Sequence, residues 1–600
     1  MKIVSFAILT LFICLIVGIS IWRTAYNWQS SPPKQVTVEA LGDSVKILWG
    51  EFNSVEIMAN SVPDALTGLG YVQGRLNGWT IALWRQAALG KLTDWYAPKG
   101  KHADRLVLQL GLAEIAQMAA NNLDTEEKDL IAAFGAGIQA AWKDADHMHE
   151  FFLQDITPEP WEPWHTLAVE RLLAWLSTSP DSVCGLGLSV CSGDAELRSM
   201  LHLQGFEFSS SWIFSTPGRS LLYQRHVLGK AVPPVFQEAV LNVRGQSELE
   251  GLSLIGTPFF PTGKSRNYAW SVLIYSPKTS GPVLDSLDQR MHLTFPTREE
   301  IVIHRRTDST FSTPGALHEL KWSGFSAISD AQSWFSLPHI SPATFQLWRG
   351  GGILMSPDGS WDVLGDPKFM FPIDSGLVVG NDPQIRHTAL YLNSINPKRS
   401  DVDTWVTDTQ STWVRDTLST MLASLPMDSL QQVLPGAPTS VNSALTYLIN
   451  WDYRFDSQSI GATIYHEWTM SAGRDLEEAL YRATNRLTQR FGDDQTQWLW
   501  ERVHESKRMF TIHRKTDSKT LEPLDTPSIG HETTMAWGGA HAAIAPVTWE
   551  AWIWNGIDNH YSIRRHHVAI HQPLGRYTTS NSRFTFSFPT LYSITTTLVP

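Results

Sequence analysis

The sequence has few cysteines and no cluster of basic residues, and each shortage excludes a class of protein. Three cysteines among 600 residues cannot build a disulfide scaffold. Cys184 and Cys191 flank a short Gly-rich loop, where the sequence leaves both a local disulfide and two free thiols open. Neither cysteine has the neighbours of a zinc site. A net charge of −12 without clustered Lys or Arg argues against a nucleic-acid partner.

Phosphate-binding and metal-binding signatures are also missing. The Gly185-x-Gly187 spacing is too short for a phosphate loop. His566, His567 and His571 lie close in sequence without a matched carboxylate, which is more typical of a solvated cluster than of a ligand set. The 26 tryptophans favour a Trp-rich core over an aromatic ligand pocket. A hydrophobic content of 43% and a charged content of 18% describe an ordinary globular chain.

One long hydrophobic run is present, at the N-terminus. Residues 3–22 are almost unbroken apolar sequence, and a helix of about 20 residues can span the roughly 30 Å of a bilayer's hydrocarbon. Gly18-Ile19-Ser20 is a poor cleavage site, so residues 1–23 favour a signal anchor over a cleaved signal peptide. We therefore expect a tether at 24–34. The rest of the chain is expected to be exported, at the periplasm or another extracytoplasmic face, and anchored by a single N-terminal transmembrane helix.

The order of helical and strand-like segments predicts the fold class. Val36 to Met58 alternates apolar and polar residues and predicts a hairpin. Helical spacing predicts helices over 64–92, 125–142, 165–176, 403–425, 440–448, 477–491 and 498–503. Strand-like sequence at 206–272 and 300–322 is expected to form the inner sheets, and strand-like sequence returns after 534. Helices, strands, helices and strands in this order favour an α+β fold.

Several motifs occur in an order that resembles one known family. They are Gly70 to Gly74, Trp84 to Leu92, Pro158 to Trp161, Phe208 to Trp212 and Ala269-Trp270. In this order they resemble the penicillin acylase (penicillin amidase) family of N-terminal-nucleophile hydrolases. The resemblance implies a four-layer αββα fold with helical additions, next to the N-terminal membrane-anchor helix. It also implies a zymogen that processes itself autocatalytically.

The resemblance places the nucleophile at Ser209. A Ser hydroxyl needs a base, and the α-amino group of a new N-terminal Ser can be that base. The Phe208–Ser209 peptide bond must therefore be cut. The implied parts are a mainly helical alpha-chain-like segment at 35–178, a spacer at 179–208 and a beta-chain-like segment at 209–600, which could form an α/β heterodimer from one chain.

Other site residues follow from the same resemblance. The family's oxyanion Asn is matched by Ser265, a possible weaker donor. Gln224 resembles its counterpart in a turn that frames the family's acyl pocket, and His226 lies one place away from its own, so we assign both as substrate-binding residues. Asn381 and Arg386 lie near positions where family members carry an Asn and an Arg.

The family's calcium-binding Asp residues have no counterpart at 271–276, so we expect no calcium and no other cofactor. The resemblance implies an amide hydrolase that acts on small-molecule acyl amides with linear carbon–nitrogen bonds. The alternative is a catalytically impaired relative that keeps the fold as a binding or scaffolding module. The number of polypeptides in the purified protein separates the two.

Overall fold

The structure is a computed structural model that describes most of the chain. The residues outside the description are 1–13, 19–31, 51–53, 144–148, 178–180, 185–187, 204–207, 217–218, 228–234, 283–288, 295–299, 308–309, 313–317, 328, 337–344, 346, 357, 382–384, 396–407, 429–431, 509–510, 514–517, 521–523, 528–547, 556–560, 567–568, 573–575, 580–583 and 588–591.

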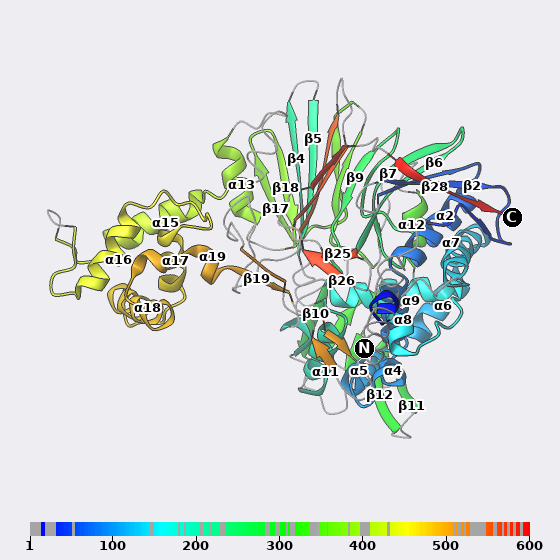
Figure 1. The fold of residues 1–600 in the computed structure, drawn as a ribbon, viewed down its shortest axis with the longest axis horizontal. Coiled ribbons are helices and arrows are strands. Elements are labelled where there is room, and N and C mark those ends of the chain that lie inside the picture. The colour runs from blue at the N-terminus through cyan, green and yellow to red at the C-terminus, as the bar shows by residue number, and fades with distance from the viewer. Residues whose placement is uncertain are drawn as a thin grey trace, which may run out of the picture.

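Two large β-sheets form the centre of the molecule (Figure 1). The ten-stranded sheet has, in spatial order, β1 (Gln35–Thr37), β28 (Tyr592–Val599), β2 (Val45–Gly50), β3 (Val55–Ala59), β6 (Phe236–Val243), β7 (Ser247–Leu254), β8 (Thr262–Lys264), β9 (Ala269–Val272), β15 (Gly352–Met355) and β16 (Trp361–Leu364). The seven-stranded sheet has β17 (Phe369–Ile373), β18 (Gly376–Gly380), β4 (Phe208–Thr216), β5 (Arg219–Val227), β23 (Thr548–Asn555), β24 (Tyr561–His566) and β27 (Phe584–Ser587). The expected hairpin at 36–58 is formed by β2 and β3.

The two sheets meet face to face through β4 and β5 on one side and β9 on the other. The Ser211 and Ser271 hydroxyls are hydrogen-bonded across the interface. The Gln224 side-chain amide donates to the Val272 carbonyl at 2.8 Å. Because strand residues alternate between faces, the odd-numbered residues of β4 point to the ten-stranded sheet, and Trp212 and Phe214 point away from it.

Helices cover the outer faces of both sheets. On the ten-stranded sheet, α2 (Val62–Leu76) packs on β2, β3 and β6, and α7 (Thr125–Lys143) packs on α2. On the seven-stranded sheet, α13 (Ile385–Ser394) packs on β17 and β18, in one cluster with Trp212 and Phe214. Helix, sheet, sheet and helix therefore follow one another as layers, and the α+β class is confirmed.

Further elements complete this main body. The helices are α3 (Gly78–Ala88), α4 (Leu92–Tyr96), α5 (Lys101–Leu110), α6 (Leu112–Asn122), α8 (His149–Gln154), α9 (Pro163–Leu176), α10 (Asp181–Cys184), α11 (Leu188–Met200) and α12 (Ala331–Ser336), with a 3-10 turn η3 (Ser323–Phe325). Three small hairpins pair β19 (Glu505–Arg508) with β22 (Leu524–Pro527), β20 (Thr511–His513) with β21 (Ser518–Thr520), and β25 (Ala569–Gln572) with β26 (Arg576–Thr579).

One part of the strand prediction is wrong. Residues 300–322 do not join the two central sheets. They lie in a separate five-stranded sheet of β10 (Lys278–Pro282), β14 (His318–Trp322), β13 (Thr310–Ser312), β12 (Glu300–Thr307) and β11 (Gln289–Thr294). The physical reason is that β12 is hydrogen-bonded to β11 and β13, its neighbours in the sequence, and not to a strand of a central sheet.

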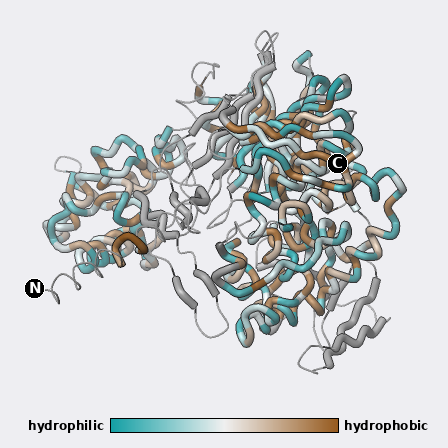
Figure 2. The backbone as a smooth tube through the Cα atoms, turned by 45° about the vertical axis from the view of Figure 1, so that its right-hand side comes forward, coloured by the Kyte–Doolittle hydropathy of each residue, from teal (hydrophilic) through white to brown (hydrophobic). Residues whose placement is uncertain are grey.

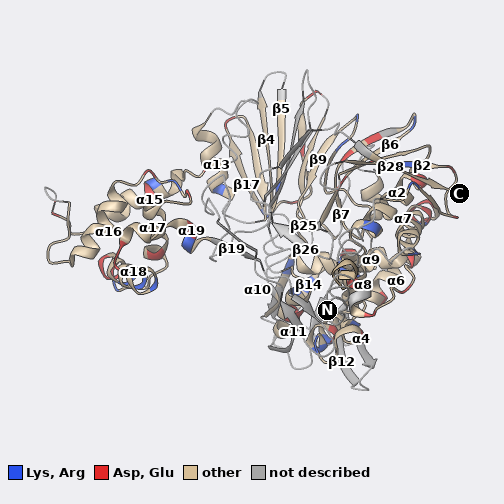
Figure 3. Ribbon diagram, in the orientation of Figure 1, with Lys and Arg blue, Asp and Glu red and all other residues tan. Residues whose placement is uncertain are grey.

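A helical lobe of residues 411–503 stands beside this body (Figure 1). It consists of α15 (Thr412–Ala423), α16 (Thr439–Ile449), α17 (Ile460–Thr469), α18 (Leu476–Phe491), the turn η5 (Gln495–Gln497) and α19 (Trp500–Val503). The lobe has its own hydrophobic core, and brown hydrophobic stretches run through both lobe and body in Figure 2. Figure 3 shows both charge signs on α18. Glu478 of this helix pairs with Arg474, just before the helix, at 3.0 Å and with Arg482 at 2.7 Å.

The expected membrane anchor is not supported. In the described parts of the chain, no helix combines the length and the apolarity needed to cross a bilayer. Of the apolar run at 3–22, only residues 14–18 are described, as a short helix, and the rest of the run lies outside the described residues. The finding contradicts the anchored location inferred from the sequence.

The segment expected to be a spacer contains structure of its own. Its described part includes α10 and α11, and Cys184 and Cys191 form a disulfide between them. Of the two alternatives that the sequence left open, the structure contains the disulfide. Cys14 is a free, exposed thiol.

Candidate active site

Cross-strand pairing builds the candidate site around Ser209. Ser209 is in β4, and its partner in the register with β5 is His226. In an antiparallel sheet, directly paired residues project from the same face, so the two side chains lie side by side. Both point to the ten-stranded sheet and are buried, with 3% exposure for Ser209 and none for His226.

Two groups contact the Ser209 hydroxyl. The Nδ1 atom of His226 lies 2.8 Å from Oγ. The backbone N–H of Ile274, just beyond the end of β9, donates to the same oxygen at 3.2 Å. The hydroxyl is thus held between a ring nitrogen on its own sheet and a backbone donor from the segment that follows the facing sheet.

The surrounding hydrogen bonds fix which ring nitrogen of His226 carries the proton. The Gln224 amide nitrogen donates to Val272, which turns its oxygen toward Thr262, and the Thr262 hydroxyl donates to that oxygen. A hydroxyl has one proton, so at 3.2 Å Thr262 Oγ1 can only accept from Nε2–H of His226. Nδ1 is then the bare nitrogen, and it accepts the proton of Ser209.

Burial keeps the imidazole neutral. The pKa of His226 is lowered from its ordinary value to about 3, because its surroundings penalise the charged form. Phe236 contributes to these surroundings, with its ring centroid 4.7 Å from that of the imidazole. A neutral ring with a bare Nδ1 is the form that can accept a proton from a serine hydroxyl.

Asn381 holds the backbone nitrogen of Ser209. Its side-chain oxygen accepts from Ser209 N–H at 2.9 Å, and its own N–H donates to the Ser209 carbonyl at 3.4 Å. Asn381 follows β18, which pairs with β4. The amide is therefore placed at the atom that would become an α-amino group if the preceding peptide bond were cut.

The other residues assigned from sequence lie elsewhere or have a different setting. Ser265 sits in the turn between β8 and β9, where its hydroxyl accepts from the N–H groups of Asn267 and Tyr268 at 3.2 Å. Gln224 is linked to Ser209 by a chain of hydrogen bonds that runs from Gln224 to Thr262, then to His226 and then to Ser209. Arg386 lies on α13, and its guanidinium covers the ring of Trp413 in the lobe, 4.5 Å from the centroid.

Two contributors to the site, Ile274 and Thr262, were not identified from sequence, and a third, Asn381, was named without a role. Ile274 acts through its backbone, which leaves no signal in a side chain. Thr262 is an ordinary strand residue whose role depends on the facing sheet. Asn381 stood near a family position, but it lies 172 residues from Ser209, so only the fold could show the contact.

Metal binding has no visible basis in the described part of the chain. There, no three His, Cys, Asp or Glu side chains are arranged to hold an ion. The side chains of His566, His567 and His571 lie outside the described residues. The expectation of no calcium and no cofactor stays a prediction.

The arrangement suits acyl transfer. A hydroxyl with a neutral acceptor at 2.8 Å can lose its proton as it attacks a carbonyl carbon. The backbone N–H of Ile274, which donates to the same oxygen, can stabilise negative charge on Oγ as the proton leaves.

Comparison with known proteins gives an independent view of the same chain. The family model for penicillin amidase matches residues 44–292 and 386–585, which is more than half of the chain. Penicillin acylase 2 proenzyme of Pseudomonas sp. (strain SE83) is 31% identical over 145 residues. That match covers 24% of this chain and only 19% of the relative's length.

Proposed function

Because the chain belongs to the penicillin amidase family, we propose that it is an amide hydrolase whose nucleophile is Ser209, exposed as a new N-terminus by self-cleavage. Family membership supports hydrolysis of amides as the reaction class. The proenzyme named among the relatives supports a processed chain. The substrate we propose is a small-molecule acyl amide with a linear carbon–nitrogen bond, which yields an acid and an amine.

One observation carries this proposal: the Ser209 hydroxyl lies between His226 Nδ1 at 2.8 Å and the Ile274 N–H at 3.2 Å. A buried neutral imidazole beside a serine hydroxyl can accept its proton, and this pairing favours a nucleophile over a structural strand residue. The hydrogen bonds from His226 to Thr262 and from Thr262 to Gln224 keep the imidazole in the tautomer that accepts the serine proton at Nδ1.

In the intact chain, His226 is the proposed base. The Ser209 nitrogen is then part of a peptide bond and cannot accept a proton. Oγ attacks the Phe208 carbonyl carbon, and its proton passes to Nδ1. The carbon–nitrogen bond breaks as the Ser209 nitrogen takes a proton. The resulting ester between Phe208 and Oγ is then hydrolysed by water to leave a free α-amino group.

In the cleaved chain, the α-amino group of Ser209 takes over as base. Reference α-amino groups titrate near pH 7.7–8.0, so a useful fraction is neutral at physiological pH. Asn381 Oδ1 already accepts from this nitrogen and would orient it. The Ile274 N–H would donate to the oxyanion of the substrate, in place of the role assigned from sequence to Ser265. The two products of cleavage would remain together as an α/β heterodimer.

The test is Ser209→Ala beside Ser210→Ala. Ser210 is the matched control because it is the next residue of β4 and points to the opposite face. Wild type and Ser210→Ala should each give a chain that starts at Ser209 on N-terminal sequencing, and should be labelled by phenylmethylsulfonyl fluoride. Ser209→Ala should stay intact and unlabelled.

A wild-type protein that remains one chain and takes no label would contradict the proposal. The chain would then be a non-catalytic member of the family that binds or scaffolds.

A further inference from the structure

Helix α11 ends shortly before Ser209 and is embedded in the body. Val190, Leu197, Leu201 and Leu203 have no exposed surface. A Cβ added at Gly193 would lie 2.8 Å from the His102 carbonyl oxygen, so the backbones of α11 and α5 are in close contact. A segment meant for removal would not be expected to supply buried core residues.

Polar contacts tie α11 to the helices around it. Arg198 and Asp194 form a buried ion pair at 2.7 Å. Asp194 also accepts from the Trp175 ring N–H at 2.7 Å, and Arg198 donates to the Leu176 carbonyl at 2.9 Å. Glu196 accepts from the Ala103 N–H at 2.8 Å, at the start of α5. Removal of α11 would leave these buried groups without their partners, which is costly in a protein interior.

The same contacts lead to the candidate site. Trp175 and Leu176 are the last residues of α9, and the next residue, Ser177, is fully buried. Its hydroxyl donates to the Ala174 carbonyl at 2.8 Å and accepts from the Ser276 N–H at 3.0 Å. Ser276 lies two residues after Ile274, whose N–H reaches Ser209. The end of α9 is thus fixed by α11 on one side and fixes the 274–276 segment on the other.

We propose that α10 and α11 stay in the first chain after cleavage and position the Ile274 N–H through the end of α9. Maturation is then a single cut at Phe208–Ser209, with no spacer excised. This inference rests on the proposed self-cleavage. The segment at 179–208, expected from sequence to be a spacer, is then a retained structural element, and Ser177 is a positioning residue.

The first test is the intact mass of both chains of the wild-type protein, separated under denaturing, non-reducing conditions. The expected first chain ends at Phe208 and contains the Cys184–Cys191 disulfide, and the second starts at Ser209. A second chain that starts at Ser209 together with a first chain that ends before Phe208 would overturn the inference and leave the proposed function standing. A single intact chain would overturn both.

The second test addresses positioning. Ser177→Ala should lower the rate of Ser209 labelling by phenylmethylsulfonyl fluoride roughly 10- to 100-fold, because small misplacements of a catalytic group have effects of this order. With an acyl 4-nitroanilide, kcat should fall by a similar factor at nearly unchanged KM. Ser177→Thr, which keeps the hydroxyl, should restore most of both rates.

The matched control is Ser419→Ala on α15, since Ser419 makes the same kind of hydroxyl contact with its own helix, to Arg415 at 2.7 Å. It should behave as wild type. A Ser177→Ala variant with wild-type labelling and kcat would overturn the positioning role.

Discussion

At the scale of single residues, the site depends on His226. Its ring is buried, neutral and fixed in one tautomer, and the bare nitrogen faces Ser209. The sequence suggested a substrate-binding role for this residue. In the function proposed above the ring is instead a proton acceptor for self-cleavage, and its contacts support this role because both ring nitrogens are engaged by the protein's own hydroxyls.

We predict that His226→Ala slows self-cleavage by about 10²- to 10⁴-fold, the usual range for loss of a general base. Thr262→Val should have a smaller effect, because the imidazole is still present. Without the Thr262 hydroxyl the ring can adopt the other tautomer, which does not accept a proton at Nδ1. The measurement is the appearance of the Ser209-initiated chain from purified precursor over time. His102→Ala, at an exposed position on α5, is the control. Cleavage of His226→Ala at the wild-type rate would rule out this base.

The pH dependence of the two reactions should differ. Burial lowers the pKa of His226 to about 3, below its ordinary value, so a change from pH 8 to pH 5 does not protonate the ring. The self-cleavage rate should therefore be nearly flat over this interval. Amidase activity of the cleaved form should fall below about pH 8, because its α-amino group becomes protonated there. An inflection of the cleavage rate near pH 6.5 would show that the ring titrates normally.

At the scale of elements, the glycine-rich motif at 70–74 has a packing role. A Cβ at Gly70 would lie 2.0 Å from the Phe134 carbonyl oxygen, and one at Gly137 would lie 2.0 Å from the Thr67 carbonyl oxygen. Glycines on both α2 and α7 therefore let the two helix backbones touch. This contact holds α7 against α2, which itself covers the ten-stranded sheet.

We predict that Gly137→Ala lowers the free energy of unfolding by about 2 kcal/mol or more, because a methyl group against backbone cannot be relieved by a change of rotamer. The measurement is the midpoint of thermal or urea unfolding. Ala132→Ser, on the exposed side of α7, is the control and should shift the midpoint little. Equal stability of Gly137→Ala and wild type would mean that the helices separate without cost.

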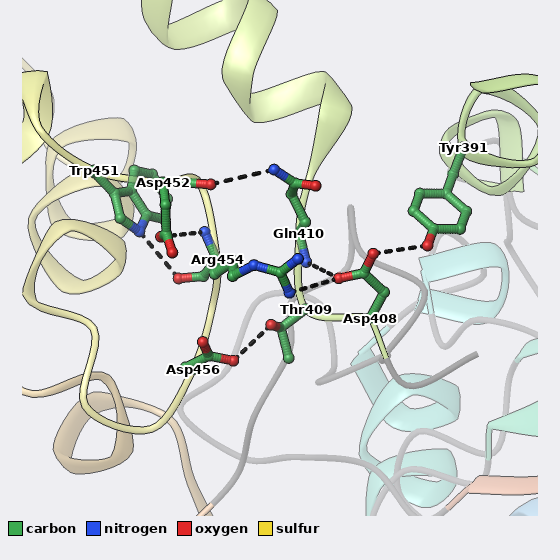
Figure 4. A network of polar contacts seen from close by, with 8 residues as sticks. All are labelled: Tyr391, Asp408, Thr409, Gln410, Trp451, Asp452, Arg454 and Asp456. Atoms are coloured by element: carbon green, nitrogen blue, oxygen red, sulfur yellow. Dashed lines mark hydrogen bonds and ion pairs between the residues drawn. The ribbon is translucent and has the colours of Figure 1, made fainter. Parts of the chain in front are cut away.

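At the scale of the whole molecule, one polar network joins the body to the helical lobe (Figure 4). Asp408 accepts from the Tyr391 hydroxyl at 2.7 Å and from Arg454 at 2.9 Å. Tyr391 belongs to α13 of the body, and Arg454 belongs to the lobe. Burial and the Asp408 carboxylate raise the pKa of Tyr391 well above its usual range, so the phenol remains a donor.

We predict that Asp408→Ala uncouples the unfolding of the lobe from that of the body, because the lobe has its own core. Differential scanning calorimetry should show a separate transition at lower temperature, while labelling of Ser209 changes less than about twofold. Asp416→Ala removes an exposed pair with Arg415 on α15 and is the control. A calorimetric trace identical to that of wild type would show that the network does not link the two parts.

The sequence by itself determined the features that depend on near neighbours in the chain. Short β-branched and aromatic runs over Phe208 to Val272 predicted strands, and helical spacing predicted α2, α7, α9 and the helices of the lobe, apart from α17. The family resemblance followed from short motifs, and the comparisons confirm it. Such patterns are set by the period of the local structure, so they can be recognised without knowledge of the fold.

Only the tertiary structure decided which groups meet at Ser209. The β4–β5 hairpin places His226 opposite Ser209. Which ring nitrogen of His226 carries the proton is decided by Thr262 of the facing sheet. The Ile274 N–H and the Asn381 amide come from segments far along the chain. Residues 300–322 were assigned to the wrong sheet for the same physical reason. Local pattern specifies the type of element, whereas its partners depend on register and packing between distant segments.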